Sequence, residues 1–166
     1  LHQCNYRNPT YTVFTTLIDG GFNPDGDVII GGNAVYTVND FIKNPFAQKH
    51  HFIANYFTGT NGYEFAYNGV FPKYGGGWFY GLDTRITSSH YIKNFFGIGN
   101  KSVNPKDEFG DNFNNVRARE FAFSPSINWN KNSSTFSAKL NYEILRIEKT
   151  ENRFVSLRNV VNEDVF

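Results

Sequence analysis

The chain of 166 residues has no methionine and one cysteine, Cys4. Because Leu1 is not an initiator residue, we expect the sequence to be a fragment of a longer chain. A single cysteine excludes an intramolecular disulfide and any zinc site built from cysteine pairs. No apolar run approaches the roughly 20 residues that a transmembrane helix needs, so the sequence excludes such a helix.

The chain also lacks an excess of charge of either sign, since it has 16 Lys and Arg residues and 15 Asp and Glu residues. We therefore expect no nucleic-acid partner. Three apparent motifs fail. Residues 23–27 lack the glycine position and the closing glutamate of an EF-hand, His50 and His51 point to opposite faces of a strand, and Gly97-Ile98-Gly99 lacks a third glycine. The sequence predicts no catalytic residue, metal site or cofactor, and hence no enzyme.

Aromatic side chains and turn-forming residues are abundant, with 18 Phe, 10 Tyr and 15 Gly. Aromatic residues suit a pleated sheet, and Gly and Asn suit its turns. The length fits one domain, so residues 1–166 are treated as a single β segment.

Alternation of apolar and polar residues predicts the strands. It is strongest over Thr135 to Glu148, where Phe136, Ala138, Leu140, Tyr142 and Ile144 alternate with Ser137, Lys139, Asn141 and Glu143. Tyr63 to Phe71 and Trp78 to Ile86 repeat the pattern. Weaker candidates are Tyr11 to Ile18, Val28 to Val38, His51 to Thr58 and Val116 to Trp129. We predict about seven antiparallel strands and no helix.

Turn chemistry separates these segments. The predicted turns are Asp19-Gly20-Gly21 with residues 23–26, then Lys43-Asn44-Pro45, Asn61-Gly62, Lys73 to Gly77 and Asn130 to Ser134. Asn61-Gly62 is expected to have positive φ at both positions. One connection, from about Ser89 to Asn115, is much longer than the others and is expected to be an external loop.

The two faces of the predicted sheet differ in a way that favours a membrane barrel over a soluble sandwich. The polar face is mostly small and uncharged, as at Ala66, Gly81 and Ser124, whereas a water-facing sheet tends to be charged. Five charged residues are expected to point into a lumen, where an ion-pair network is the favoured interpretation over an active-site dyad: Glu64, Asp83, Arg85, Lys139 and Glu143. The apolar face is aromatic, with Trp78, Tyr91 and Trp129 near strand ends.

The sequence therefore predicts an all-β fold, an antiparallel transmembrane β-barrel. Seven strands with unpaired edges would expose backbone donors and acceptors, so we expect a partial segment of a larger barrel. Its first and last strands should lack partners within the chain.

The segment Asn94 to Ser102 resembles the "FFGxGN-x-[ST]" segment of the bacterial surface antigen outer-membrane barrels, the BamA/TamA-like superfamily. The matching loop residues are Phe96, Gly97, Gly99 and Asn100. Residues 25–32 and 41–47 resemble further blocks of the branch fused to calcineurin-like metallophosphoesterases in Bacteroidetes. The resemblance covers about residues 10–155 and implies roughly half of a barrel of about sixteen strands.

The resemblance implies a bacterial outer-membrane location and a role in outer-membrane protein assembly or insertion, or in anchoring a periplasmic metallophosphoesterase domain. The implied partners are outer-membrane lipid, the remainder of the barrel and other assembly proteins. The family's Arg-Gly-Phe loop motif, its periplasmic domains and phosphoesterase metal motifs are not found here, so any phosphoesterase activity would reside in a domain outside this chain. Two alternatives stay open: a structural or channel barrel without client handling, and a soluble β-sandwich binding module.

Overall fold

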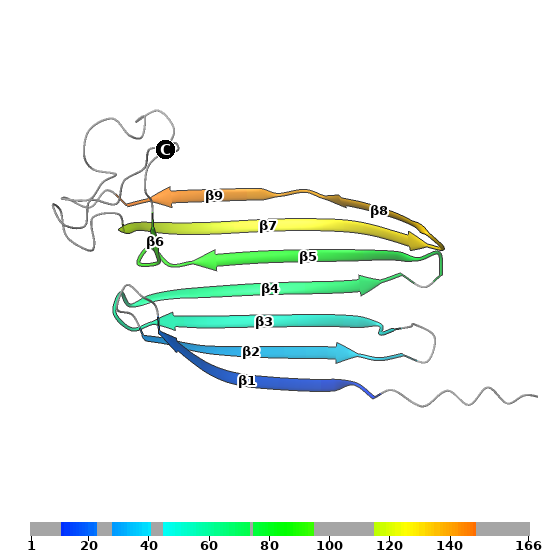
Figure 1. Ribbon diagram of the computed structural model, residues 1–166, viewed down its shortest axis with the longest axis horizontal. Helices are drawn as coiled ribbons and strands as arrows, with labels where there is room; N and C mark the ends of the chain where they lie inside the picture. Colours follow the sequence, from blue (N-terminus) through cyan, green and yellow to red (C-terminus); the bar gives the residue numbers. More distant parts are fainter. Residues whose placement is uncertain (1–10, 23–27, 41–44, 74, 95–114, 149–166) are drawn as a thin grey trace, which may run out of the picture.

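The computed structural model describes residues 11–22, 28–40, 45–73, 75–94 and 115–148. Within these ranges every element of regular secondary structure is a β-strand (Figure 1). They are β1 (Val13–Phe22), β2 (Val28–Val38), β3 (Gln48–Phe57), β4 (Gly62–Pro72), β5 (Trp78–Thr87), β6 (Ile92–Asn94), β7 (Asn115–Lys131), β8 (Ser134–Lys139) and β9 (Tyr142–Ile147). Among these residues no helix is long and apolar enough to cross a membrane.

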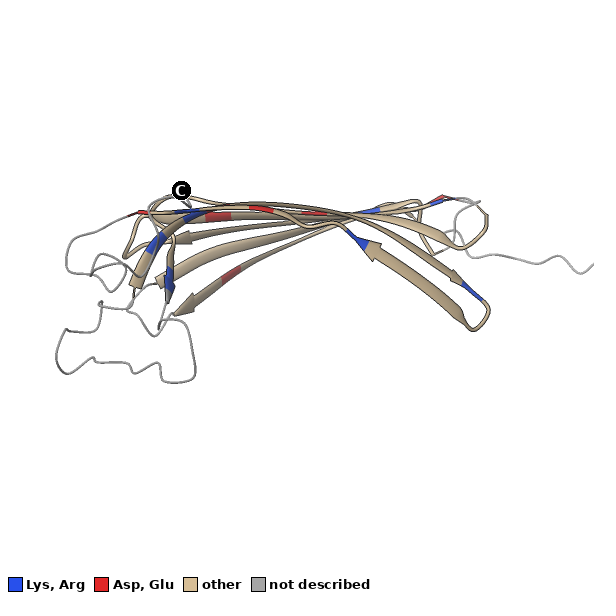
Figure 2. Ribbon diagram, turned by 90° about the horizontal axis from the view of Figure 1, so that it is seen from above, with Lys and Arg blue, Asp and Glu red and all other residues tan. Residues whose placement is uncertain are grey.

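The strands form one antiparallel sheet in the order β1-β2-β3-β4-β5-β7, with β6, β8 and β9 also paired to β7. The prediction of an all-β antiparallel fold is thus confirmed. Seen edge-on, the sheet is a twisted layer whose strands leave a common plane (Figure 2). The sheet is not closed: within the described residues β1 pairs only with β2, and β8 and β9 pair only with β7. This agrees with the expected unpaired first and last strands.

The nine strands exceed the expected seven for two local reasons, and the first lies at Pro125. Strands β8 and β9 continue one register on β7, because Ser126 faces Lys139 and Phe123 faces Tyr142, an interval of three residues on both strands. The Leu140 amide donates to the Pro125 carbonyl at 3.0 Å. Proline has no N–H to return that bond, so the ladder breaks opposite it. The predicted strand Thr135 to Glu148 is therefore one strand in two pieces.

The second reason is a bulge between β5 and β6, which both pair with the same edge of β7. Ile86 faces Phe121 and Ile92 faces Arg117, so six residues on one side match four on the other. The two extra residues bend the chain after Thr87. Strand β6 was not predicted, because residues 92–94 were placed in the long connection.

One turn prediction is wrong, and another is right only in part. Asp19-Gly20-Gly21 belongs to β1, because these residues continue the ladder opposite Gly31, Ile30 and Ile29. Asn61 has the expected positive φ of 54°, whereas Gly62 begins β4 without one, so the turn covers Thr58–Asn61. The expected turn at 130–134 shrinks to residues 132 and 133, with Asn132 at φ 55°. The expected turn at 73–77 lies between β4 and β5, as predicted, and the remaining two, at 23–26 and 43–45, lie wholly or mainly outside the described residues.

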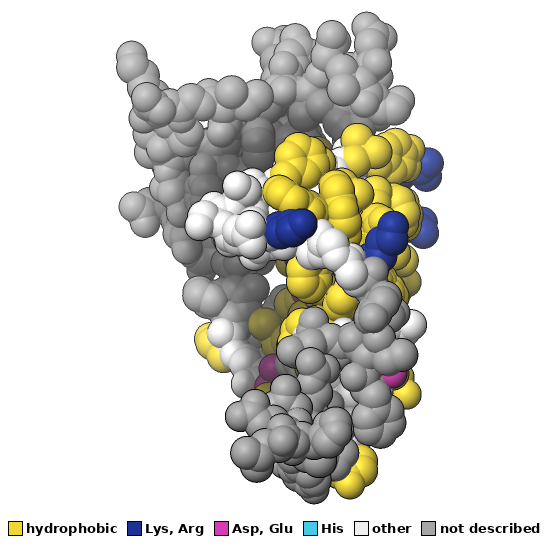
Figure 3. All heavy atoms as spheres, turned by 90° about the vertical axis from the view of Figure 1, so that its right-hand side faces the viewer, with side chains coloured by type: hydrophobic (Ala, Val, Ile, Leu, Met, Phe, Trp, Pro, Cys, Tyr) yellow, Lys and Arg dark blue, Asp and Glu magenta, His cyan; other side chains and the backbone are white. Residues whose placement is uncertain are grey.

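Cross-strand pairing defines the two faces of the sheet. One face, which we call the apolar face, carries a row of directly paired residues: Phe52, Tyr67, Thr84, Phe123 and Tyr142. The residues immediately before and after these on each strand lie on the other face, which we call the polar face. Lys139 and Leu140 fall on opposite faces, as predicted. In strands β1 to β5 the apolar face carries no Asp, Glu, Lys or Arg. Viewed from the end where β2, β4 and β7 terminate, hydrophobic side chains gather together with Lys and Arg beside them (Figure 3).

Candidate functional site

The polar face holds a connected group of charges at the end of the sheet where β5 and β6 meet. Arg85 Nε donates to Glu64 Oε1 at 2.6 Å, and Arg85 Nη1 lies 3.8 Å from Glu120 Oε1. Lys93 Nζ lies 2.5 Å from the other Glu120 oxygen. The Glu120 side chain is only 7% exposed, so it is the most deeply buried member of this cluster. Two carboxylates thus alternate with two cations.

The bulge after β5 covers this cluster. The Thr87 hydroxyl accepts the Glu120 amide at 2.8 Å, which fixes β5 against β7. The Ser88 hydroxyl accepts the Tyr63 amide, and the Ser88 amide donates to the Tyr63 carbonyl, so the bulge also contacts β4. The centre of the Tyr91 ring lies 5.6 Å from the Arg85 guanidinium, and the Tyr91 hydroxyl accepts a hydrogen bond from Arg85 Nη2 at 3.0 Å. The bulge therefore brings Lys93 and Tyr91 to the polar face.

Further polar side chains link neighbouring strands across the same face. Lys139 Nζ lies 2.8 Å from Asp83, which also accepts a bond from Asn68. Across β1 to β3, Asn33 donates to Asp19 at 3.1 Å and contacts the His51 ring nitrogen at 3.2 Å. Asn55 of β3 donates to Glu64 of β4 at 3.1 Å, so side-chain contacts link each neighbouring pair of strands from β1 to β5 and reach β8.

The five charged residues singled out in the sequence all lie on the polar face. Glu64 pairs with Arg85 and Asp83 pairs with Lys139. Glu143 faces Ala122, and no described basic side chain forms an ion pair with it. Sequence reasoning missed Glu120 and Lys93. Glu120 sits in the alternating Arg-Ala-Arg-Glu run of β7, a signal that could have found it, whereas Lys93 depends on the bulge.

The loop residues Phe96, Gly97, Gly99 and Asn100, on which the family resemblance rests, lie outside the described residues. His50 and His51 do point to opposite faces, since His51 bonds to Asn33 while His50 bonds to the Tyr67 hydroxyl at 2.9 Å. Within the described part of the chain no group of three or more His, Cys, Asp or Glu side chains is placed to hold a metal ion.

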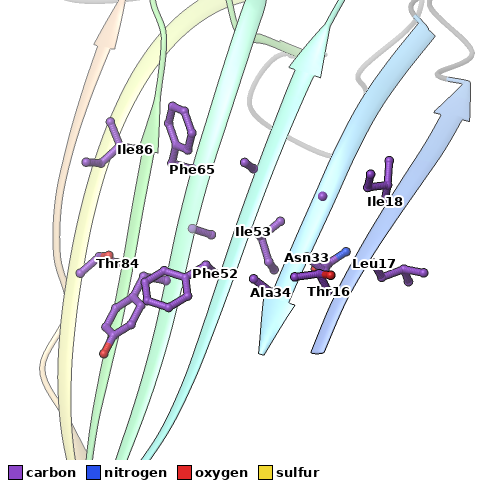
Figure 4. Close-up of a pocket in the computed structure, with 14 residues that line it drawn as sticks. Thr16, Leu17, Ile18, Asn33, Ala34, Phe52, Ile53, Phe65, Thr84 and Ile86 are labelled. Carbon is purple, nitrogen blue, oxygen red and sulfur yellow. The ribbon is translucent and has the colours of Figure 1, made fainter. Parts of the chain in front are cut away.

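The apolar face has a shallow groove of about 580 Å³ over β1 to β5 (Figure 4). Small residues, Gly32, Ala34 and Ala54, form its floor between Ile18 and the aromatic rings of Phe52 and Phe65. Almost no polar surface lines it. The groove is thus suited to hydrocarbon.

Comparisons of the chain with protein-family models, with curated proteins and with solved structures find no match. The geometry alone must then indicate the chemistry. Each carboxylate of the main cluster contacts a cation, so the cluster is a connected ion-pair network.

Proposed function

We propose that this chain is part of a bacterial outer-membrane β-barrel, with lipid against its apolar face and the barrel interior against its polar face. The observation that carries this is the segregation of charge. Ion pairs lie on one face, while β1 to β5 have no Asp, Glu, Lys or Arg on the other. Many large apolar side chains are exposed, including Phe14 at 65%, Phe65 at 52% and Tyr142 at 54%.

The height of the uncharged band supports the proposal. On the apolar face of β7 the residues between Arg119 and Lys131 are Phe121, Phe123, Pro125, Ile127 and Trp129. Twelve residues span ~40 Å along a strand, which a tilt of about 45° reduces to ~28 Å, close to the roughly 25 Å apolar band of such barrels. Trp78 and Trp129, with ring centroids 6.2 Å apart, lie at one margin of this band, where aromatic girdles occur.

Within this class, the proposed role is that of a surface-antigen barrel, in outer-membrane protein assembly or in anchoring a periplasmic metallophosphoesterase domain. The resemblance at residues 94–102 supports it. The open edges at β1 and at β8 with β9 fit an arc of a wider barrel, whose remaining strands would come from further residues or another chain. Depletion of the intact protein from cells is expected to reduce folded outer-membrane proteins if the assembly role holds, and to leave them unchanged if the anchoring role holds.

The membrane location can be tested with the two native tryptophans. The intact protein is reconstituted into phosphatidylcholine vesicles whose acyl chains carry bromine at different depths. We expect Trp78 and Trp129 to be quenched most by bromines near the interface, and the protein to float with the vesicles. Recovery in detergent-free buffer without quenching would overturn the proposal and favour a soluble β-sandwich.

A further inference from the structure

Two arginines lie side by side on the apolar face at the margin opposite the tryptophans. Arg119 of β7 and Arg146 of β9 are direct cross-strand partners, and both are exposed. Directly opposed like charges destabilise a sheet, with Cβ atoms only about 5 Å apart. Among the described residues no carboxylate forms an ion pair with either side chain. The position therefore calls for an anion that the described chain does not supply.

Neighbouring charges leave the site cationic. Arg117 precedes Arg119 by two residues and shares its face, and its Nε is buried without a partner among the described residues. Within the described ranges, Glu148 is the carboxylate that shares this face: its amide donates to the Arg117 carbonyl at 2.9 Å, and it follows Arg146 by two residues. Three guanidinium groups thus face one carboxylate.

A cavity of about 300 Å³ connects these arginines to the apolar band. Its apolar walls are Ile86, Phe121 and Ile144, and Arg119 and Arg146 stand at its rim; Glu120 also borders it, although its side chain belongs to the opposite face. Guanidinium groups bind phosphate oxygens in a fork, and the adjacent hydrophobic walls suit an acyl chain. A ligand with a phosphate beside hydrocarbon would satisfy both parts.

We propose that Arg119 and Arg146 form a binding site for the phosphate headgroup of a membrane lipid, whose acyl chain lies against Ile86, Phe121 and Ile144. The site rests on the proposed membrane function, because only a lipid-facing sheet brings headgroups to this margin. The lipid offsets the repulsion between the two cations and fixes the depth of β7 and β9 in the membrane.

The test uses the intact protein in a neutral detergent and phosphatidic acid with a fluorescent acyl chain as the probe. The double variant R119Q/R146Q is expected to weaken binding at least about tenfold, and R119K/R146K less, because lysine keeps the charge but loses the fork. K131Q is the matched control, since Lys131 is exposed on the same strand and face at the opposite margin, and it should bind like the unaltered protein.

Two further probes separate lipid from a free anion. Diacylglycerol with the same chains should bind weakly to every variant, and inorganic phosphate should not displace phosphatidic acid. Three results would each overturn the lipid site. They are binding of phosphatidic acid by R119Q/R146Q as tight as by the unaltered protein, binding of diacylglycerol as tight as that of phosphatidic acid, and displacement of phosphatidic acid by inorganic phosphate. Flotation with phosphatidylcholine vesicles is measured in parallel: a protein that floats while R119Q/R146Q binds normally refutes this site alone, whereas a protein that never floats refutes the membrane function.

Discussion

Glu120 joins two cations that come from different strands, Arg85 on β5 and Lys93 on β6. A carboxylate this deeply buried depends on its partners, because an unpaired charge in that position would be poorly solvated. Replacing it with an uncharged side chain would leave both cations with less compensation. Removing the Glu120 carboxylate should therefore destabilise the bulge as well as β7.

We expect Glu120→Gln to lower the free energy of unfolding by about 2 kcal/mol, less than for a fully buried pair because Arg85 and Lys93 are partly exposed. Glu143→Gln is the matched control on the same face and should change stability by no more than about 0.5 kcal/mol. Denaturant unfolding followed by tryptophan fluorescence measures both. Equal losses in the two variants would mean that the ion pairs at Glu120 contribute nothing specific.

Gly77 and Gly75 occupy the same turn between β4 and β5, and both have positive φ, at 74° and 72°. A Cβ at Gly77 would overlap the Asn130 carbonyl oxygen, whereas a Cβ at Gly75 would meet nothing within 4 Å. Gly75→Ala should cost about 1 kcal/mol from backbone strain alone, and Gly77→Ala about 3 kcal/mol or more. The same unfolding measurement decides, and a similar cost at both positions would argue against the close contact.

At the scale of single elements, β7 is the central strand of the half of the sheet that holds the charge cluster. It has 17 residues and pairs with β5 and β6 on one edge and with β8 and β9 on the other. Consecutive residues of β7 lie on opposite faces of the sheet. Phe123 lies on the apolar face opposite Thr84, and Ser124 lies on the polar face opposite Asp83.

We predict that Phe123→Lys reduces membrane integration, because a lysine near the middle of a lipid-facing strand costs about 2–4 kcal/mol. Ser124→Lys, one residue away, should integrate normally, since it places a cation opposite Asp83. The measured quantity is the fraction of each variant that floats with phosphatidylcholine vesicles. If Ser124→Lys were the more damaging change, the assignment of lipid and interior to the two faces would be reversed.

The strands could largely be predicted from alternation, and their ends could not. Alternation identified every long strand, because a period of two is a local property of the residues. Asp19-Gly20-Gly21 was read as a turn because glycine pairs favour turns, yet the pairing with β2 holds these residues extended. Likewise β6 exists through its contact with β7, a partner more than twenty residues later in the chain. Such long-range pairing leaves no local pattern.

At the scale of the whole molecule, the two ends of the sheet have different connections. At one end β6 and β7 are separated by twenty residues of sequence, and the turn at Thr58–Asn61 lies at the same end; at the other end the longest connection is the nine residues between β2 and β3, and the shortest is the turn at 132–133. Outer-membrane barrels keep short turns on the periplasmic side and longer loops outside. The proposed barrel would thus expose the Thr58–Asn61 end on the cell surface.

This orientation can be measured by labelling intact cells with a membrane-impermeant maleimide. In a Cys4→Ser background, Gly59→Cys should be labelled and Ser133→Cys should react only after the outer membrane is permeabilised. Both positions are exposed, so accessibility of the side chain itself is matched. The reverse pattern would invert the orientation, and labelling of both positions in intact cells would contradict a membrane-spanning sheet.

The two-residue turn between β7 and β8 also sets the polarity of the last strand. From Lys131 opposite Ser134 to Ala118 opposite Ile147, every pairing keeps the same register, so the pairing that begins at this turn decides which side chains lie on which face. One residue inserted here, with the turn kept at two residues, would shift every pairing by one and move each following side chain to the opposite face of the sheet. Lys139 and Glu143 would then lie on the apolar face, and Phe136 and Ile144 on the polar face. A single codon inserted there would exchange the inside and the outside of the strand without changing any of its amino acids.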